Sequence, residues 1–253
     1  MPQRPRIAIP LRRNLDAPNE YLSPDYAEAV HAAGGAPFHL PLIPDPESVR
    51  RLLDGAEGIC LPGSNSDVDP SLYGAERHPK LGPVQPRRDA TDALLLAEAE
   101  RRGLPLLAIC YGLQRLNVFR GGDLHQDLRS AGYERIDHRV FPGAGHDVRL
   151  DLSAWPRPLW ALREAIRALV PPGAGGEFVF RVNTSHHQAV RTPAPGAAVF
   201  AQAPDSVIEG IVFPGEGRFL LGVQWHPERD PESGLSRAIF RSFVEACGAY
   251  RPL

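Results

Sequence analysis

The chain has 253 residues, of which 43% are hydrophobic and 23% charged, an ordinary globular composition that excludes collagen-like, coiled-coil and disordered proteins. Its 28 basic and 30 acidic residues give a formal net charge of −2, so the charge indicates neither a nucleic-acid partner nor binding to an anionic membrane. No apolar run approaches the roughly 18 residues of a membrane span, and the first residues do not form a secretory leader, so we expect a cytoplasmic protein.

Short apolar runs alternate with helical patterns along the chain, which is typical of a largely parallel sheet with helices on both faces. In the first half, strands are expected at 6–10, 36–42, 57–61 and 104–109, and helices at 25–33, 47–53, 87–102 and 112–119. In the second half, strands are expected near 135–141 and 147–152 and at 178–182, 197–202, 207–213 and 219–223, and helices at 158–169 and 236–246. The later strands have hairpin spacing and are expected to be antiparallel. Because no repeat or linker interrupts the pattern, we expect one domain over residues 1–253.

Two scarce residue types limit the chemistry. Lys80 is the only lysine, and its surroundings suit neither a P-loop nor a Schiff base. The three cysteines, at positions 60, 110 and 247, are odd in number and widely spaced, which fits neither a disulfide framework nor a zinc knuckle. At least one thiol is therefore expected to be free.

Cys110 lies between a predicted strand and a predicted helix, in the run Ala108-Ile109-Cys110-Tyr111-Gly112. A nucleophile on such a tight turn needs small residues two positions to either side, which Ala108 and Gly112 provide. The start of the helix would stabilise a thiolate through its partial positive charge and free amides. Cys110 is therefore a candidate nucleophile, whereas Cys60 and Cys247 are interpreted as small core residues.

His226 and Glu228 follow another apolar strand, 116 residues beyond Cys110. The carboxyl ends of parallel strands share one edge of a sheet, where active sites gather. A thiol needs an imidazole to take its proton, and the imidazole needs a carboxylate to hold its tautomer. Together the three residues indicate nucleophilic catalysis.

Two polar stretches are predicted to bind the reacting groups. After the strand at 57–61, Gly63 would let main-chain amides approach an oxyanion, together with the amide of Tyr111. The second stretch is the polar loop at 182–188 between two strands. A metal site is the alternative for four residues of these stretches, but their spacing lacks a paired ligand motif, so no metal and no cofactor are expected. These four residues are Asp67, Asp69, His186 and His187.

On these residues the sequence resembles the class I glutamine amidotransferase superfamily, and within it the γ-glutamyl-γ-aminobutyrate hydrolase family, peptidase family C26. The resemblance extends from Ile7 to the last predicted helix. The motifs that carry it are Leu61-Pro62-Gly63-Ser64, Asp67-Val68-Asp69-Pro70, Leu72-Tyr73-Gly74, Arg88-Asp89, Cys110-Tyr111-Gly112-Leu113-Gln114 with Asn117, the run from Gly121 to Leu128, Val182-Asn183-Thr184 with His186-His187-Gln188, and the run from Gly222 to Glu228.

The resemblance implies a flavodoxin-like α/β fold: a mostly parallel central sheet with helices on both faces and a small antiparallel extension. It implies a triad of Cys110, His226 and Glu228 and an oxyanion hole from the amides of Gly63 and Tyr111. It also implies a substrate pocket, lined by Gln114, Asn183, His186 and Ser64. The expected partner is a small-molecule γ-glutamyl amide, as in polyamine catabolism, and a homodimer is left open.

Three functional hypotheses stay open at this point. The first is hydrolysis of a γ-glutamyl amide through a thioester, releasing glutamate and an amine. The second is a glutaminase subunit that delivers ammonia to a synthetase, and the third is a catalytically silent relative, against which the retained triad argues. Family members often carry Arg at the position of Tyr111 and Gly at that of Ala108, so the sequence does not define the amine.

Overall fold

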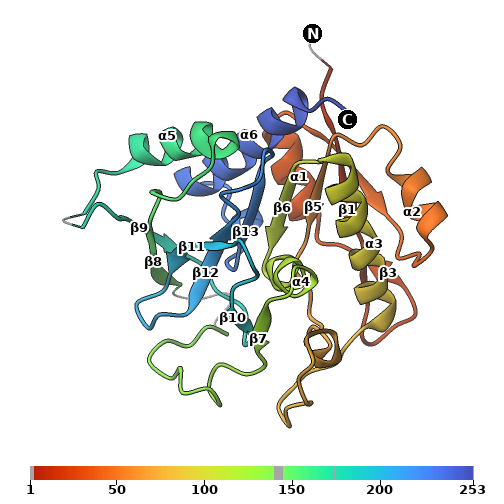
Figure 1. The fold of residues 1–253 in the computed structure, drawn as a ribbon, viewed down its shortest axis with the longest axis horizontal. Coiled ribbons are helices and arrows are strands. Elements are labelled where there is room, and N and C mark those ends of the chain that lie inside the picture. The colour runs from red at the N-terminus through yellow and green to blue at the C-terminus, as the bar shows by residue number, and fades with distance from the viewer. Residues whose placement is uncertain (1–2, 140–144, 174, 253) are drawn as a thin grey trace.

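Most strands form one large sheet that is parallel at one side and antiparallel at the other, and two short strands, at 12–13 and 20–21, form a separate antiparallel pair (Figure 1). The protein is described here by a computed structural model, for residues 3–139, 145–173 and 175–252. The strands are β1 (Arg6–Pro10), β2 (Arg12–Arg13), β3 (Glu20–Tyr21), β4 (Ala36–Leu40), β5 (Gly58–Leu61), β6 (Leu106–Ile109), β7 (Asp123–His125), β8 (His146–Leu150), β9 (Phe178–Val182), β10 (Ala189–Thr192), β11 (Ala198–Gln202), β12 (Ile208–Val212) and β13 (Leu220–Val223). The helices are α1 (Pro24–Ala32), α2 (Pro46–Leu52), α3 (Pro86–Arg102), α4 (Tyr111–Phe119), α5 (Trp160–Leu169) and α6 (Gly234–Ala249), with short 3-10 turns η1 (Pro70–Tyr73), η2 (Arg157–Leu159) and η3 (Pro227–Arg229).

The strand order is β4-β1-β5-β6-β13-β12-β11-β8-β9, and β10 joins β12 to β7. The pairs from β4 to β13 are parallel, and those beyond β13 are antiparallel. Strand β13 therefore marks the change, because it pairs parallel with β6 and antiparallel with β12. This agrees with the predicted fold class.

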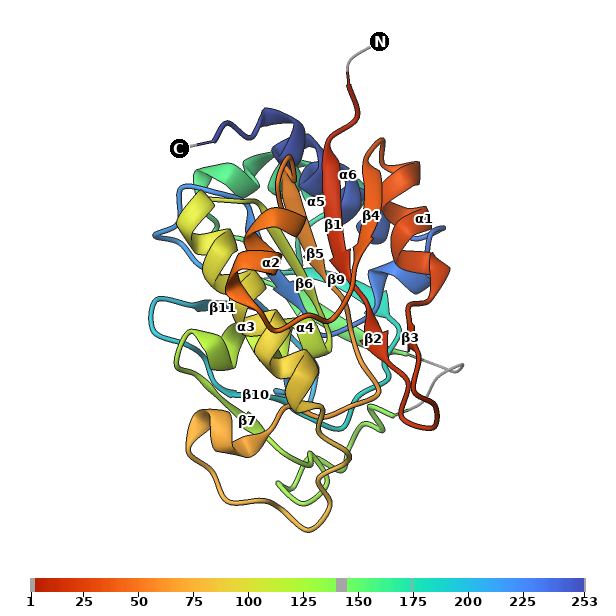
Figure 2. The same cartoon turned by 90° about the vertical axis from the view of Figure 1, so that its right-hand side faces the viewer.

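The parallel strands are covered on both faces, as their continuous apolar runs predict. Successive side chains of β1 alternate between two core clusters. Ile7 and Ile9 belong to the cluster that includes residues of α1, α5 and α6, whereas Ala8 belongs to the cluster that includes residues of α2, α3 and α4. Figure 2 shows α2, α3 and α4 together on one side of these strands. The helices thus form a layer on each face of the sheet.

Most predicted elements are present with ends shifted by one to three residues, but the irregular middle of the chain differs from the prediction. Residues 135–139 form turns and bends rather than a strand, and residues 140 and 141 of that predicted strand lie outside the described residues. Here Ile136 packs against the cluster around Leu128, and the His138 carbonyl accepts hydrogen bonds from His186 N and Thr184 Oγ1. The backbone at His138 is thus hydrogen-bonded to the loop that contains Thr184 and His186 rather than to a neighbouring strand. The sequence also missed the short strands β2, β3, β7 and β10.

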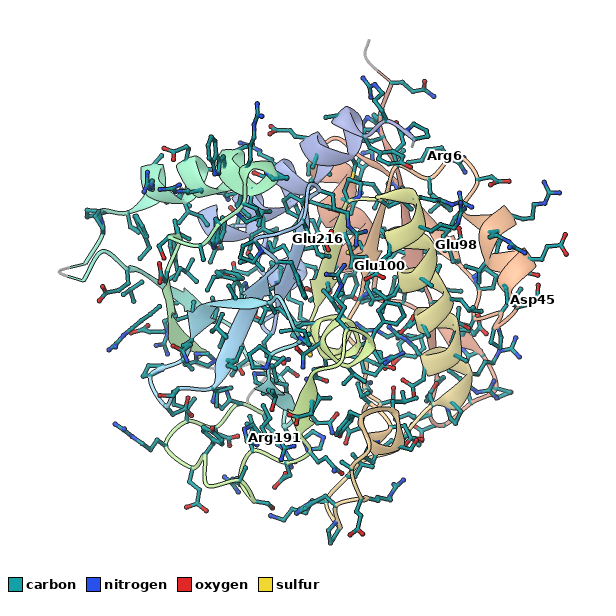
Figure 3. All side chains as sticks on the ribbon, viewed as in Figure 1. Arg6, Asp45, Glu98, Glu100, Arg191 and Glu216 are labelled. Carbon is teal, nitrogen blue, oxygen red and sulfur yellow. The ribbon has the colours of Figure 1, made fainter. Side chains whose placement is uncertain are left out.

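Charged side chains at the surface link neighbouring elements. Arg120 bridges Glu100 on α3 and Glu216 in the β12–β13 loop, with N···O distances of 2.8 and 2.7 Å. The two glutamates are labelled in Figure 3. Such exposed pairs contribute little to stability individually. Among the described residues, every helix is too short or too polar to cross a membrane.

Candidate active site

Three adjacent parallel strands, β5, β6 and β13, end at the same edge of the sheet. Gly63 follows β5, Cys110 follows β6 and His226 follows β13. This is the edge at which open α/β sheets bind their ligands. The topology therefore gathers three of the predicted site residues from widely separated parts of the chain.

Cys110 occupies a strained turn between β6 and α4. Its φ of 53° and ψ of −109° are unusual for a residue with a side chain, and the residue is 4% exposed. The turn is fixed because Cys110 N donates to Val223 O at 2.8 Å, and because α4 lies so close to β5 that a Cβ on Gly112 would collide with the Leu61 carbonyl. The sulfur is thereby held at the N-terminus of α4, where the helix favours negative charge.

The imidazole of His226 is buried and bonded to a carboxylate. Its Nδ1 atom lies 2.6 Å from Glu228 Oε1, and both residues are at most 3% exposed. Burial alone would lower the pKa of His226, but the Glu228 carboxylate and the adjacent Cys110 sulfur raise it to about 9. The ring therefore favours the protonated form next to the sulfur.

The backbone of His226 is fixed by a residue from the polar loop after β9. Asn183 Nδ2 donates to His226 O at 2.8 Å, and His226 N donates to Asn183 Oδ1 at 2.9 Å. These two bonds hold both backbone polar groups of His226, so Asn183 orients this residue. The substrate-binding role that the resemblance implies for Asn183 stays a prediction.

Gly63 lies in the most crowded part of the site. A Cβ at this position would lie 2.9 Å from His226 Cε1, 3.1 Å from the Tyr26 hydroxyl and 3.3 Å from Cys110 Cβ. Only glycine lets the chain pass between these groups without moving them. The Gly63 amide donates to Tyr26 Oη at 3.1 Å in this structure, so this predicted oxyanion donor has a protein acceptor.

Tyr26 and Arg12 are residues of this site that the sequence did not indicate. Arg12 Nη2 donates to Tyr26 Oη at 2.6 Å, and both side chains are buried. Burial raises the pKa of Tyr26 well above its ordinary value, and the neighbouring Glu228 carboxylate raises it further. Neither residue belongs to a recognisable local motif, because their contacts join α1 to β2 and to the loop after β5.

The side chain of Tyr111 is buried against Arg88 and Asp89 of α3, while its backbone amide is at the start of α4. Its hydroxyl donates to Asp89 Oδ1, and the guanidinium of Arg88 lies 4.7 Å from the ring centre. Arg88 Nη2 also donates to Pro62 O at 3.0 Å, next to Gly63. The Arg88-Asp89 motif thus supports two turns of the site.

Three further residues predicted to line the substrate pocket are engaged within the protein. Gln114 Nε2 donates to Gln188 O and to Gln224 Oε1, at 3.0 and 3.1 Å, and Ser64 Oγ is 2.8 Å from Ser66 Oγ. His186 instead points into a buried cluster, where its Nε2 atom lies 3.4 Å from Glu209 Oε1 and its Nδ1 atom lies 2.9 Å from Gln188 O. The structure therefore does not bring His186 to Cys110.

The alternative metal ligands of the sequence analysis do not form one cluster. These residues are Asp67, Asp69, His186 and His187. His187 Nε2 lies 2.9 Å from Asp67 Oδ1, and Asp69 caps the turn η1. His186 instead joins His138, His146 and Glu209, whose ligand atoms lie within 4.8 Å of one another. This buried cluster is separate from the Cys110 edge and was not anticipated.

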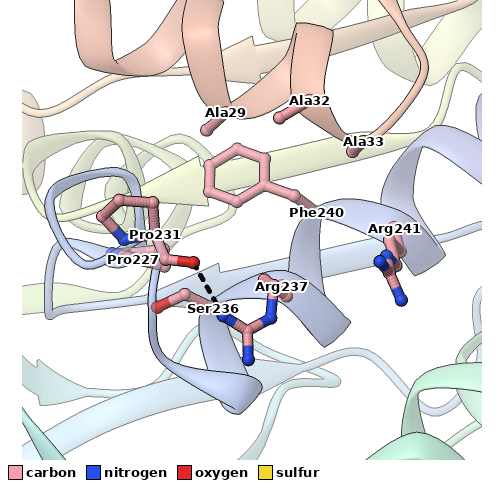
Figure 4. Close-up of a pocket in the computed structure, with 9 residues that line it drawn as sticks. All are labelled: Ala29, Ala32, Ala33, Pro227, Pro231, Ser236, Arg237, Phe240 and Arg241. Atoms are coloured by element: carbon pink, nitrogen blue, oxygen red, sulfur yellow. Dashed lines mark hydrogen bonds between the residues drawn. The ribbon is translucent and has the colours of Figure 1, made fainter.

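A small pocket of about 110 Å³ lies between α1 and α6, lined by Ala29, Ala32 and Phe240 (Figure 4). Pro227 is at its border, directly after His226. Its lining includes neither Cys110 nor Gly63, so this pocket is not the space over the sulfur.

Comparison with known proteins gives a consistent family and fold. The sequence model described as peptidase C26 matches residues 8–228. A Mycobacterium tuberculosis protein provisionally named a glutamine amidotransferase is 38% identical over 236 residues, covering 93% of this chain and 70% of the relative. The gamma-glutamyl-gamma-aminobutyrate hydrolase of Escherichia coli K12 is 34% identical over 236 residues, covering 89% of this chain and 86% of the relative. A solved glutamine amidotransferase of Thermotoga maritima is 14% identical, with a TM-score of 0.60 over 98% of this chain and 100% of that chain, which shows a shared fold.

Proposed function

The chain belongs to the peptidase C26 family, and on this premise we propose that it is a cysteine hydrolase that cleaves the γ-glutamyl amide bond of a small γ-glutamyl amine. The 34% identical relative from Escherichia coli is named for such a substrate, γ-glutamyl-γ-aminobutyrate. The observation that carries the proposal is the juxtaposition of Cys110, on its strained turn, with the His226–Glu228 pair.

In the proposed reaction the Cys110 sulfur is the nucleophile. The raised pKa of His226, about 9, means that the imidazole holds a proton at neutral pH, and this charge stabilises a neighbouring thiolate. The thiolate attacks the γ-carbonyl carbon and forms a C–S bond, which gives a tetrahedral oxyanion. Glu228 holds the His226 tautomer with the other ring nitrogen directed at the reacting groups.

Collapse of the tetrahedral species breaks the C–N bond. The imidazolium of His226 gives its proton to the leaving nitrogen, so the product is a neutral amine and a γ-glutamyl thioester of Cys110. Neutral His226 then takes a proton from water as the water attacks the thioester. Glutamate leaves, and the sulfur returns as a thiolate beside a protonated imidazole.

The oxyanion is assigned to the amides of Gly63 and Tyr111. The Tyr111 amide belongs to the first turn of α4, where amides have no partner within the helix. The Gly63 amide donates to Tyr26 in the ligand-free protein. An oxyanion is a stronger acceptor than a phenol oxygen that already accepts from Arg12, so it would take over this amide.

Turnover of a defined panel tests the proposal. Purified full-length protein is incubated with γ-glutamyl amides of several small amines, γ-glutamyl-γ-aminobutyrate among them, and with glutamine, and released glutamate is measured. We expect turnover of at least one amine conjugate by the protein alone and none by the Cys110→Ser variant. Absence of turnover across the panel, with no thioester trapped on Cys110, contradicts the proposal.

A second candidate is a glutaminase that supplies ammonia to a synthetase, and the provisional name of the 38% identical relative favours keeping it. It predicts that glutamine is the best substrate and that turnover is weak without a partner. The same panel separates the two functions, because only the hydrolase prefers conjugates of larger amines.

We also propose that residues 1–253 act as one domain, supported by the single large sheet that extends from β4 to β9.

A further inference from the structure

Three histidines and one glutamate converge inside the antiparallel half of the sheet, away from the Cys110 edge. Glu209 is on β12, His146 on β8, and His186 in the loop between β9 and β10, while His138 precedes β8. The side chains are between 0% and 5% exposed. Glu209 Oε1 lies 3.3 Å from His146 Nε2, 3.4 Å from His186 Nε2 and 3.5 Å from His138 Nδ1.

In each of the three histidines, the ring nitrogen that faces away from Glu209 makes a hydrogen bond. This bond determines which nitrogen carries the proton, and the nitrogen that faces Glu209 then has the lone pair. His146 Nδ1 lies 2.9 Å from Asp147 O, and His186 Nδ1 lies 2.9 Å from Gln188 O. A backbone carbonyl only accepts, so each of these Nδ1 atoms carries the proton. His138 Nε2 lies 3.0 Å from Asp205 Oδ2 and donates in the same way. Metal-binding histidines are oriented by this kind of outer hydrogen bond to a carbonyl or carboxylate.

Among the described residues, the inward-facing atoms meet one another only through the long contacts of 3.3–3.5 Å to Glu209 Oε1, and none of them makes a hydrogen bond of good geometry. They comprise both carboxylate oxygens of Glu209 and one nitrogen from each of the three rings. Burying a carboxylate and several polar nitrogens with only these long contacts is costly, and buried charges in proteins are usually closely paired or bound to a metal. Four of these atoms, one from each residue, lie within 4.8 Å of one another and therefore indicate a site for a cation.

The spacing of these atoms matches a tetrahedral metal ion. A zinc ion with ligands at roughly 2.0–2.1 Å separates neighbouring ligand atoms by about 3.3–3.4 Å, close to the three distances from Glu209 Oε1. All four ligand atoms lie within 4.8 Å of one another, so small side-chain rotations bring them onto one centre. We propose that His138, His146, His186 and Glu209 bind a divalent transition-metal ion of the zinc type. Three imidazoles and one carboxylate suit zinc, whereas magnesium and calcium prefer oxygen ligands.

The role of this ion is to fix the loop that orients His226. His186 lies three residues after Asn183, whose amide holds both backbone groups of His226. The backbone of Glu209 accepts from Gln224 N at 2.7 Å, two residues before His226. The ion is thus a positioning element at a distance from the substrate, and its four protein ligands leave no position for catalysis.

Metal titration of the full-length protein tests this assignment. The protein is treated with a chelator, desalted and titrated with Co²⁺, followed by Zn²⁺. We expect one equivalent of Co²⁺ to give visible absorption bands of tetrahedral intensity, Zn²⁺ to displace it, and the melting temperature to rise on Zn²⁺ addition. These readouts are independent of hydrolase turnover, so the metal site can fail while the proposed function holds, and the reverse.

Variants of adjacent histidines provide a matched pair. His186→Asn removes a proposed ligand, while His187→Asn changes the next residue, whose nearest charged groups are Asp67 and Asp127. We expect His186→Asn and Glu209→Gln to lose the Co²⁺ bands and His187→Asn to keep them. Asp205→Asn removes an outer partner and should weaken metal affinity roughly 10- to 100-fold.

Two results overturn the assignment. One is a folded wild-type protein that shows no Co²⁺ bands and retains no Zn²⁺ after desalting. The other is binding that His186→Asn and His187→Asn weaken equally. If the Glu209 or His186 variant does not fold, the wild-type titration and the Asp205→Asn variant still decide.

Discussion

The Nδ1 atom of His226 lies 2.6 Å from the Oε1 atom of Glu228 inside the protein. This contact, with the nearby sulfur of Cys110, keeps the pKa of His226 at about 9 although burial opposes the charge. Without the carboxylate, burial would dominate and the ring would lose its proton at a lower pH. The pair therefore determines over which pH range the imidazole can act as an acid.

The first prediction concerns this pH range. The proposed acid is the imidazolium of His226, so kcat/KM should fall as the pH rises through about 9 and the ring loses its proton. In Glu228→Gln the carboxylate that raises the pKa is gone, so the alkaline limb should move to lower pH and kcat should fall at least about tenfold. Initial rates across neutral and alkaline pH measure both effects. An unchanged alkaline limb in the variant would contradict the assigned role of Glu228.

The second prediction uses the crowding at Gly63. In Gly63→Ala the new methyl group would meet His226, Tyr26 and Cys110 at 2.9 to 3.3 Å, so the reacting groups must shift. We expect kcat/KM to fall by about 100-fold or more, because displacements of about 1 Å can have effects of this size. Gly217→Ala is the matched control, since no atom lies within 4 Å of its Cβ position. Equal activity of the two variants would show that Gly63 tolerates a side chain.

The third prediction separates two roles for Asn183. Its two hydrogen bonds to the His226 backbone indicate that Asn183 positions His226, whereas the family resemblance implies that Asn183 binds substrate. We expect Asn183→Ala to lower kcat roughly 10- to 100-fold with little change in KM, and to broaden the pH dependence assigned to His226. Steady-state kinetics with saturating substrate distinguish the cases. A higher KM with unchanged kcat would return Asn183 to the substrate pocket.

The central part of this fold could be predicted from sequence because its signals are local. The strands before Gly63, Cys110 and His226 are short apolar runs, and parallel topology brings their ends to one edge. Cys110 meets His226 because β13 also lies next to β6 in the sheet, an order that the apolar runs themselves do not encode.

Contacts between distant polar residues could not be predicted in the same way. Tyr26 meets Gly63 across 37 positions, and no pattern around either residue encodes the contact. The cluster around Glu209 combines residues from two strands and two loops, at spacings that resemble no metal motif. The segment at 135–139 alternates like a strand, yet His138 is directed into that cluster.

The fourth prediction concerns the three thiols. Burial raises the pKa of Cys60 and of Cys247, and both are fully buried, whereas Cys110 is beside a protonated imidazole. Under native conditions iodoacetamide should modify Cys110 alone, and mass spectrometry should find one adduct per chain. The Cys110→Ser variant should then remain unlabelled. Modification of Cys60 or Cys247 at a comparable rate would show that reactivity does not follow this electrostatic difference.

The fifth prediction concerns the ion pair under the site. Arg88 is completely buried, its Nε atom donates to Asp92 Oδ2 at 3.0 Å, and its Nη2 atom supports the Pro62 carbonyl. Replacing it with alanine leaves the buried Asp92 carboxylate without its cation, so Arg88→Ala should lower the free energy of unfolding by about 3–5 kcal/mol. Because Arg88 also supports the turn before Gly63, activity should fall in molecules that stay folded.

The control for Arg88 comes from the same helix. Arg101 pairs with Glu98 at the exposed end of α3, so Arg101→Ala should leave the urea midpoint nearly unchanged. The double variant Arg88→Ala/Asp92→Asn should recover part of the lost stability, since the stranded charge is removed with its partner. If Arg88→Ala and Arg101→Ala unfold at the same urea concentration, the buried ion pair does not stabilise the turn at Pro62. The apolar contacts of β5 and β6 would then stabilise this edge of the sheet instead.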